Sequence, residues 1–170
     1  RFTITTNGLL LDDAKIAYIN DNMDNVVISL DGRKEVNDKV RKRLDGSGCY
    51  ERILPRFQKL AESRGQDKYY IRGTFTRYNL DFDKDVMHLV DLGFKQISVE
   101  PVTGPSDMPY TIKCEDLPEI DLTYDRLAQQ MLKREAEGKG FNFFHFMIDF
   151  EGGPCVIKRL SGCGSGNEYV

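Results

Sequence analysis

The sequence is poor in the patterns that mark several large classes of protein. No stretch approaches the roughly 20 consecutive apolar residues that a membrane-spanning helix needs, so we expect no membrane partner. The formal net charge is −3 and no long basic run is present. This argues against nucleic acid as the main partner, because phosphate binding requires clustered Lys and Arg. Neither a Ser-His-Asp arrangement nor a glycine-rich phosphate loop is recognisable, so two common types of active site are not indicated.

Cysteine is sparse and scattered. The four cysteines, Cys49, Cys114, Cys155 and Cys163, form no CxxC pair, so a zinc site of the usual kind is not expected. The simplest interpretation is that they are reduced thiols, as in a cytoplasmic protein. Cys155 and Cys163 differ from the other two because they lie in a glycine-rich stretch.

What the sequence does contain is the composition of a globular domain. Hydrophobic residues make up 40% and charged residues 30% of the 170 residues, which allows one domain with a full core. Short apolar or β-branched runs alternate with segments of helical spacing. We predict strands over residues 2–6, 26–30, 69–78, 96–99 and 141–150, and helices over 13–20, 34–44, 53–61, 81–92 and 120–137.

This alternation predicts an α/β fold with parallel strands, because short joints between strands and helices favour parallel crossovers. A doubly wound sheet and a barrel both fit the pattern. The chain begins with Arg1 rather than Met, directly before a predicted strand, so we expect an internal part of a longer protein. Glycine becomes frequent and helical spacing stops at Glu151. We therefore assign residues 1–150 to one domain and residues 151–170 to the start of a second.

Polar side chains gather at or near the ends of the predicted strands. In parallel α/β folds, ligands bind at the carboxyl ends of strands. Hydroxyls and amides suit ribose and amino-acid groups, and Arg pairs with carboxylate or phosphate. The polar residues at these positions are Thr5, Thr6, Asn7, Ser29, Asp31, Arg72, Thr74, Thr76, Arg77, Ser98, Glu100, His145 and Asp149.

Most of these residues also have a purely structural interpretation. Asn7-Gly8 and Asp31-Gly32 are common turn pairs. Arg72 interrupts an otherwise apolar strand, and a buried Arg needs an anionic partner. That partner could be a ligand or an internal carboxylate such as Glu100 or Asp31.

Three further residues leave alternatives open. Glu100, which precedes Pro101, fits either a catalytic base or a hydrogen-bond anchor. His145 lies in a Phe-rich strand, where a core histidine is the simplest interpretation, and His88 falls in a helix as a surface or packing residue. Pro55 either occupies the first turn of its predicted helix or kinks that helix.

Taken in order, the short motifs resemble one enzyme family. The first group resembles the middle of the radical S-adenosylmethionine (SAM) barrel in enzymes that carry a SPASM or similar auxiliary-cluster domain. This group comprises Thr5-Thr6-Asn7-Gly8, Ile28-Ser29-Leu30-Asp31-Gly32, Asn37-Asp38 and Arg41. The second group resembles the maturases of six-cysteine (SCIFF) peptides. It comprises residues 72–77, 93–101, 141–146 and 152–155, so that the resemblance covers nearly the whole chain.

The resemblance implies a fold, a cofactor and a reaction. Family members share a partial, TIM-like (β/α)6 barrel. A [4Fe-4S] cluster on a CxxxCxxC loop cleaves SAM, and the resulting 5′-deoxyadenosyl radical abstracts hydrogen from the substrate. In the closest branch the substrate is a cysteine-rich precursor peptide made on the ribosome, in which the enzyme installs a thioether link.

The motif match also implies roles for individual residues. Thr6 and Asn7 would line the SAM pocket. Ser29 would lie beside the methionyl or ribose part of SAM, and Arg72 would hold its carboxylate. Ser98 to Glu100 would lie near the adenosine or the peptide. The resemblance identifies no catalytic residue, and Glu100 is a candidate for that role.

The C-terminal cysteines take a different role in this resemblance. Gly162-Cys163-Gly164 resembles the start of the auxiliary-cluster domain, so Cys163 would be its first Fe-S ligand. Glycine-rich surroundings suit a cluster because backbone amides can approach its sulfurs closely. Cys155 would be a second ligand or a reactive thiol, and the interpretation of both as structural thiols stays open.

The sequence also departs from the family. It contains no CxxxCxxC motif and no Gly-Gly-Glu segment before Thr3, and Asn37 stands where relatives often have His. We therefore expect that the full-length protein is the enzyme and that this chain alone does not cleave SAM. A barrel without its first strands would leave an open edge at residues 2–6, which predicts self-association through that edge.

Two other functions fit the residues without the resemblance. The first is a different α/β enzyme acting on an anionic metabolite, with Arg72 as the anion clamp and Glu100 as the base. The second is a non-catalytic peptide-binding module that uses strand edges and the polar loop near residues 103–110.

Overall fold

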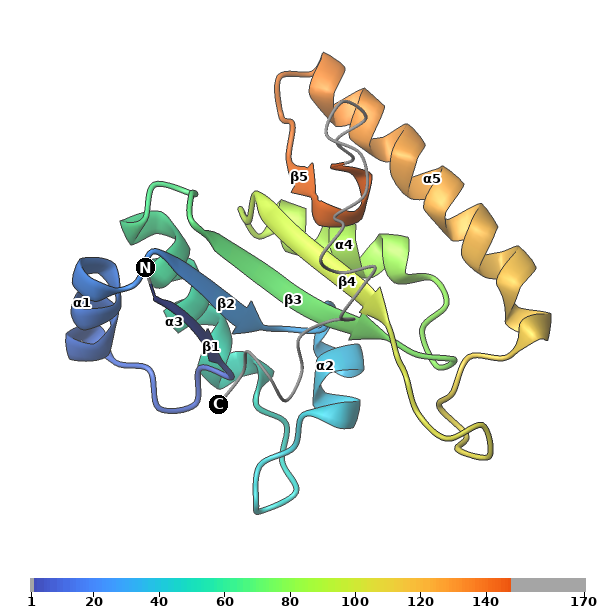
Figure 1. The fold of residues 1–170 in the computed structure, drawn as a ribbon, viewed down its shortest axis with the longest axis horizontal. Helices are drawn as coiled ribbons and strands as arrows, with labels where there is room; N and C mark the ends of the chain where they lie inside the picture. Colours follow the sequence, from blue (N-terminus) through green and yellow to red (C-terminus); the bar gives the residue numbers. More distant parts are fainter. Residues whose placement is uncertain (1, 148–170) are drawn as a thin grey trace, which may run out of the picture.

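The computed structural model describes residues 2–147, which form one parallel sheet with associated helices (Figure 1). The sheet order, β1-β2-β3-β4-β5, is also the sequence order, and every neighbouring pair is parallel. The predicted α/β class with parallel strands is therefore confirmed. The strands are β1 (Thr3–Thr6), β2 (Asn25–Ser29), β3 (Tyr69–Phe75), β4 (Gln96–Pro101) and β5 (Asn142–Phe143). The helices are α1 (Asp13–Asn22), α2 (Lys34–Val40), α3 (Tyr50–Ser63), α4 (Phe82–Asp91) and α5 (Leu117–Ala136).

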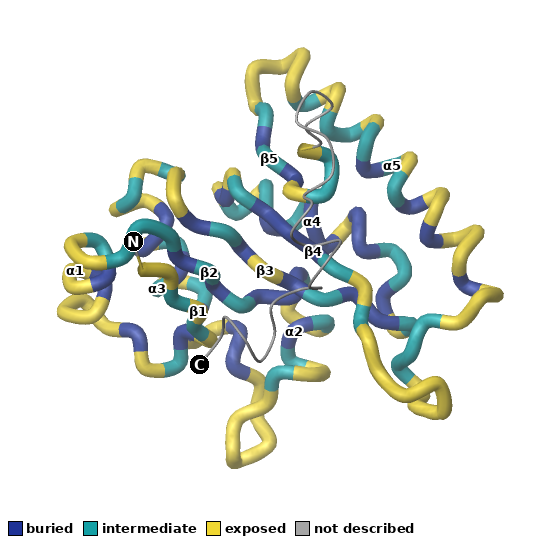
Figure 2. Tube along the Cα trace, viewed as in Figure 1, coloured by how far each residue is buried: buried dark blue, intermediate teal, exposed yellow. Residues whose placement is uncertain are grey.

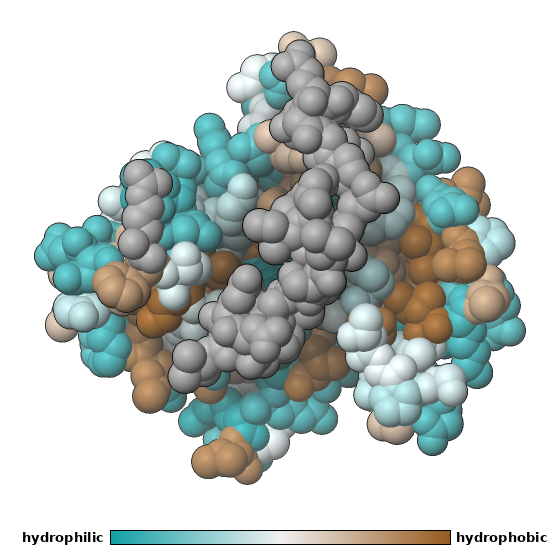
Figure 3. Space-filling model, in the orientation of Figure 1, coloured by the Kyte–Doolittle hydropathy of each residue, from teal (hydrophilic) through white to brown (hydrophobic). Residues whose placement is uncertain are grey.

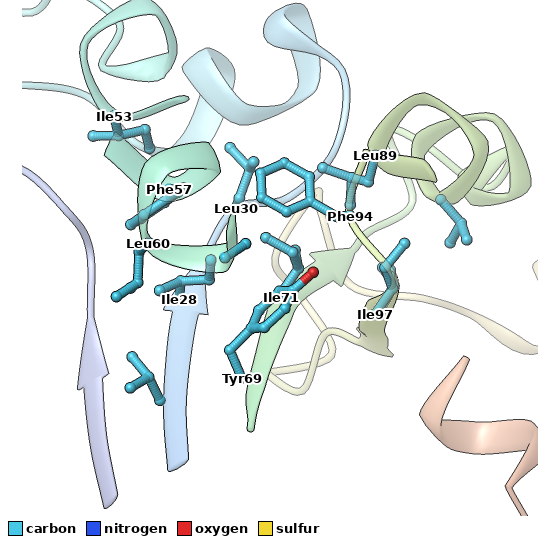
Figure 4. Close-up of a cluster of buried hydrophobic side chains, with 14 of the residues drawn as sticks. Ile28, Leu30, Ile53, Phe57, Leu60, Tyr69, Ile71, Leu89, Phe94 and Ile97 are labelled. Carbon is cyan, nitrogen blue, oxygen red and sulfur yellow. The ribbon is translucent and has the colours of Figure 1, made fainter. Parts of the chain in front are cut away.

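One face of the sheet is covered by helices and holds the hydrophobic core. Phe57 and Leu60 of α3 lie over Ile28 of β2, and Leu89 of α4 lies on the side of Ile97 of β4 (Figure 4). All five side chains are completely buried. Burying one such side chain contributes about 1.5–3 kcal/mol, so this face fixes the sheet and its helices as one unit.

The long helix α5 packs on α4. The ring of Tyr124 in α5 meets Phe82 of α4 edge to face, with the ring centroids 4.9 Å apart. Close by, the Thr123 hydroxyl donates to the Leu80 carbonyl at 2.9 Å. The helix therefore extends the covered side of the molecule outward beyond α4, as the orange helix in Figure 1 shows.

The prediction of a strand over residues 141–150 is wrong for its described part beyond Phe143. Strand β5 contains only Asn142 and Phe143, which pair with Gln96 and Ile97 of β4. Residues 144–146 form a 3₁₀ turn, and Phe144 is half exposed. The alternation of buried and less buried residues stops at Phe143, and consecutive aromatic rings cannot all reach one core. They pack on one another instead, with Phe143 and Phe146 centroids 5.1 Å apart.

Two other elements end earlier than predicted because the chain turns after them. Strand β3 stops at Phe75, since the Asn79 side-chain oxygen accepts the Thr76 backbone N–H at 2.8 Å. Helix α2 stops at Val40, because Arg41 has left helical geometry with φ −100° and ψ 84°. Both turns place polar groups at the carboxyl end of the sheet.

Three further predictions concern Pro55, the edge of the sheet at β1 and the domain boundary. Helix α3 begins at Tyr50, so Pro55 lies inside the helix and the first-turn alternative is wrong. Among residues 2–147, β1 pairs only with β2, and self-association through its other edge stays a prediction. The assigned boundary at residue 151 falls outside the described residues.

Candidate functional site

The second face of the sheet carries polar side chains in register. Helices α3 and α4 lie behind the sheet in Figure 1, so the face that no described helix covers, called here the open face, is turned toward the viewer. Parallel pairing places Arg72 of β3 between Ser29 of β2 and Ser98 of β4. Residues in register point to the same face, so these three form one row, called here the Arg72 row. The next row pairs Thr74 with Glu100.

Arg72 is exposed, and the expectation that it is a buried arginine is wrong. It is the one exposed residue of β3, whose other residues are buried or half-buried (Figure 2), and its side chain is 57% exposed. Its Nη2 donates to Glu100 Oε2 at 2.7 Å, which confirms Glu100 and not Asp31 as the internal partner. Such an exposed pair contributes little to stability, about 0–1 kcal/mol, so it leaves the guanidinium available to a ligand.

Glu100 also lies close to a serine and a histidine. The Ser98 hydroxyl is 3.4 Å from Glu100 Oε1 and 3.5 Å from His145 Nε2, which are long and weak contacts. His145 is half-buried in the 3₁₀ turn rather than in the core, so the prediction of a core histidine is wrong. The open face therefore collects a guanidinium, a carboxylate, two serine hydroxyls and an imidazole.

The other histidine has a structural role. His88 Nε2 lies 2.6 Å from the hydroxyl of Tyr50, which joins α4 to α3. Burial raises the pKa of Tyr50 above its ordinary value, with a further contribution from nearby carboxylates. The packing interpretation of His88 is confirmed.

Thr6 and Asn7 are placed at the end of β1 and do not join the Arg72 row. Thr6 is in register with Ile28, which is a core residue. Its hydroxyl accepts the Gly8 N–H at 3.1 Å, and the Asn7 side-chain oxygen accepts the Leu9 N–H at 3.2 Å. These contacts build the turn after β1, and a role in binding SAM stays a prediction for both residues.

Asp31 fixes the point where β2 leaves the sheet. Its carboxylate is 1% exposed and accepts two hydrogen bonds from Arg41, at 2.6 Å from Nε and 2.9 Å from Nη2. The same carboxylate accepts the Thr74 N–H at 3.0 Å, in place of a backbone carbonyl of β2. Gly73 lets the strands approach, since a Cβ there would lie 2.8 Å from the Leu30 carbonyl oxygen. In the sequence Arg41 stands out only as part of a motif, and its charge is the sole signal of this contact.

The turn after Asp31 is fixed by a second buried carboxylate. Asp85 of α4 accepts the backbone N–H of Arg33 at 3.0 Å and the Arg33 Nε at 2.7 Å. The hydrogen bond that Arg33 donates to Asp85 is the main cause that holds the pKa of the Arg33 guanidinium above its ordinary value. At Gly32, φ is 131° and a Cβ would lie 2.3 Å from the Asp85 Cβ, so only glycine fits.

A groove runs along the carboxyl end of β3, next to the Arg72 row. It consists of two hollows of about 400 and 230 Å³ that share the lining residues Val40, Thr74, Thr76 and Tyr78. The Lys39 ammonium lies 3.7 Å above the centre of the Tyr78 ring, a cation–π contact on the wall of this groove. Hydrophilic side chains dominate the outer border of this side of the molecule (Figure 3).

Metal-binding residues are not brought together in the part of the chain that the structure describes. Within residues 2–147 there is no group of three His, Cys, Asp or Glu residues that could hold a metal ion. Cys49 is buried and Cys114 is exposed, and both are free thiols. The predicted cluster ligands Cys155 and Cys163 lie outside the described residues. No helix among the described residues is long and apolar enough to span a membrane.

Comparison with known proteins gives a match in structure but not in sequence. No family model matches the sequence, and no curated protein matches it. Among solved structures, native anSMEcpe with bound AdoMet and Kp18Cys peptide has a TM-score of 0.73 at 19% identity. A histidine-tagged anSMEcpe with bound AdoMet gives the same two values. Native anSMEcpe with bound AdoMet and Cp18Cys peptide has a TM-score of 0.71 at 18% identity.

These matches cover a much larger share of this chain than of the anSMEcpe chain. Each covers 85% of this chain but only 40% of the anSMEcpe chain. The chain thus spans less than half the length of the solved structures that it matches. At this level of identity the likeness establishes a shared fold, an α/β unit with parallel strands like part of the AdoMet-bound anSMEcpe.

Proposed function

We propose that this chain is the SAM-binding part of a radical SAM enzyme that modifies a peptide. The observation that carries the proposal is the Arg72 row, in which an exposed guanidinium lies between two serine hydroxyls on the open face of a parallel sheet. The shared fold with AdoMet-bound anSMEcpe supports the choice of SAM over other ligands with a carboxylate.

The side chains of the open face fit the groups that SAM presents. SAM carries a carboxylate and an ammonium on its methionyl part, and hydroxyls on its ribose. Arg72 would bind the carboxylate through N–H groups that its contact with Glu100 leaves unused. Ser29 and Ser98 would bind the methionyl or ribose part. Glu100, held by Arg72, acts in this proposal as an anchor for the guanidinium rather than as a base.

The described residues do not fit the Fe-S cluster that the family uses. A CxxxCxxC motif is missing from the sequence, and residues 2–147 contain no cluster of metal-binding side chains. The proposal therefore assigns this chain binding and orientation of SAM, and no step of SAM cleavage. Cys163 and Cys155 as ligands of an auxiliary Fe-S cluster in residues 151–170 remain part of the proposal through the resemblance alone.

The substrate in this proposal is a cysteine-rich peptide made on the ribosome, in which the full-length enzyme forms a thioether link. Two of the similar structures contain bound Kp18Cys and Cp18Cys peptides, which supports a peptide substrate. The thioether rests on the sequence resemblance. The free thiols of Cys49 and Cys114 fit a reducing compartment such as the cytoplasm.

Calorimetric titration of the chain with SAM tests the proposal. Arg72→Gln removes the guanidinium at little cost to stability, because its ion pair is exposed. We expect this change to raise the Kd for SAM about tenfold, which corresponds to the loss of roughly one charge-assisted hydrogen bond. The matched control is Arg52→Gln on the exposed side of α3, which should leave the Kd unchanged.

Equal affinity for SAM in the two variants would contradict the proposal. Binding of phosphate or of a dicarboxylate at Arg72, without binding of SAM, would favour the alternative of another α/β enzyme acting on an anionic metabolite.

A further inference from the structure

Arg41 presents an unused edge of its guanidinium beside the groove. Asp31 occupies only one side of this planar group, through Nε and Nη2. A guanidinium has five N–H donors, and its end, formed by Nη1 and the outer N–H of Nη2, can bind a second carboxylate in a two-point contact. No residue within 2–147 occupies the Arg41 Nη1. The side chain is 30% exposed and lines the larger of the two hollows.

The geometry of this guanidinium is fixed before any ligand binds. Asp31 is almost completely buried and also accepts the Thr74 N–H, so it cannot move without disturbing β3. A side chain held in this way loses little conformational freedom when it binds a ligand, which lowers the entropic cost of binding. Arg41 is therefore a preformed donor for a carboxylate.

Charge in the middle of the groove comes from Lys39. The charge of Arg41 is balanced by Asp31, so Arg41 alone supplies donors rather than net charge. Lys39 has no carboxylate partner within residues 2–147, and its ammonium is held above the Tyr78 ring. The one other carboxylate of the lining, Glu35, lines the smaller hollow only, is 72% exposed and lies 3.9 Å from Arg33. The middle of the groove thus favours an anion.

We propose that the groove binds the peptide substrate through the carboxylate of an internal Asp or Glu side chain, which pairs end-on with Arg41 and is attracted by Lys39. The two hollows share Thr74 and Tyr78, and each extends to further residues, Val102 and Tyr110 in one and Val36 and Asn79 in the other, so together they offer room for more than one residue of a chain. This favours an internal side chain over a terminal carboxylate. The inference rests on the proposed function for the identity of the ligand as substrate.

The groove adjoins the proposed SAM site. Thr74 lies in its floor, pairs with Glu100 in the sheet, and follows Arg72 by two residues. Two residues of a strand span about 7 Å. A peptide held at Arg41 would therefore cross the carboxyl end of β3 next to the Arg72 row. Arg41 would select substrates that carry an acidic residue near the modified position.

Binding of matched peptides to the unaltered 170-residue chain tests this inference. The probes are acetylated and amidated seven-residue peptides, Gly-Ser-Gly-Glu-Gly-Ser-Gly and the same peptide with Gln in place of Glu. A third probe is the Gln peptide with a free C-terminal carboxylate. Titrations are followed by NMR at low salt through the Thr74 amide signal, which every variant keeps. Where Arg41 is present, its Nε–H signal is followed as well. We expect the Glu peptide to bind about tenfold more tightly than either other probe.

Three variants connect this preference to the groove. Arg41→Lys keeps a cation beside Asp31 but removes the guanidinium end that can make a two-point contact with a carboxylate. It should therefore abolish the preference for the Glu peptide. Lys39→Gln does not touch Asp31, and should reduce the preference about threefold. Lys42→Gln, an exposed lysine outside the groove lining, is the control and should keep it.

Equal binding of the Glu and Gln peptides, or no binding of either, would overturn the inference, as would tighter binding of the peptide with the free C-terminus. SAM titrations of the same samples keep the two proposals apart. Preference for Glu without SAM binding would leave the carboxylate site standing and remove the function, and SAM binding without the preference would do the reverse.

Discussion

The two faces of the sheet are built from the same strands but follow different physical rules. On the covered face, side chains such as Ile28, Ile71 and Ile97 are fully buried against α3 and α4. On the open face, their strand neighbours Ser29, Arg72 and Ser98 are polar, and Arg72 is the most exposed of them. The first face supplies stability, and the second carries the polar side chains on which the proposed function rests. Because successive residues alternate between the faces, each can be altered with little effect on the other.

The strongest test of this comparison uses two adjacent residues of β2. Ile28→Ala removes a fully buried side chain and should lower the free energy of unfolding by about 3–4 kcal/mol, through lost burial and the cavity that remains. Val27→Ala alters the half-buried residue on the open face and should cost about 1 kcal/mol or less. Urea unfolding measures both. Similar losses in the two variants would show that the faces do not differ in this way.

A second test compares two ion pairs at the carboxyl end of the sheet. Asp31→Asn weakens a buried carboxylate that serves both Arg41 and the Thr74 N–H, and should cost about 2–3 kcal/mol. Glu100→Gln alters the partner of the exposed Arg72, and should cost less than about 1 kcal/mol. Thermal unfolding of the two variants provides the measurement. A larger loss for Glu100→Gln would mean that the open face contributes to stability after all.

The smallest expected effect is on the pH dependence of stability, through the contacts of Asp38 with the start of α3. Burial tends to raise the pKa of Asp38, but hydrogen bonds from Lys34, the Tyr50 N–H and Asn37 outweigh it, so the pKa is lowered on balance. A carboxylate with a lowered pKa in the folded state stabilises the fold above its unfolded pKa, about 3.9. That stabilisation is lost as the pH falls through the folded pKa.

Asp38→Asn should therefore flatten the decline in stability below about pH 4, by about 1 kcal/mol or less. The urea midpoint, followed between pH 7 and pH 2.5, measures this change. An unaltered pH dependence in the variant would show that the contacts of Asp38 with the start of α3 do not stabilise the fold.

Local patterns in the sequence predict the covered face well, because buried positions are occupied by apolar residues at regular spacing. The apolar run before Ser29 and the helical spacing of Phe57 and Leu60 identified β2 and α3. The sequence also predicts the members of the Arg72 row, since Ser29, Arg72 and Ser98 are each polar residues of predicted strands. Their alignment in one row required the register between strands, which follows from tertiary packing.

The errors arose where long-range contacts decide the outcome. The exposure of Arg72 could not be deduced, because strands of parallel sheets are commonly buried on both faces and the sequence does not show which face is covered. The contact of Asp31 with Arg41 crosses a turn and a helix, so no local pattern reveals it. The aromatic run after Phe141 favoured a long strand by composition, but only two of its residues find partners in β4.

The identity of sheet order and sequence order has a consequence for how the domain folds. Each described strand pairs with the strand that follows it along the chain, so the sheet can grow one strand and one helix at a time without distant segments meeting first. Central β3, with seven residues and partners on both sides, is the natural nucleus, whereas two-residue β5 gains least from pairing. Local opening should therefore begin at β5 and reach β3 last, so that the strand carrying Arg72 is the most persistent part of the sheet.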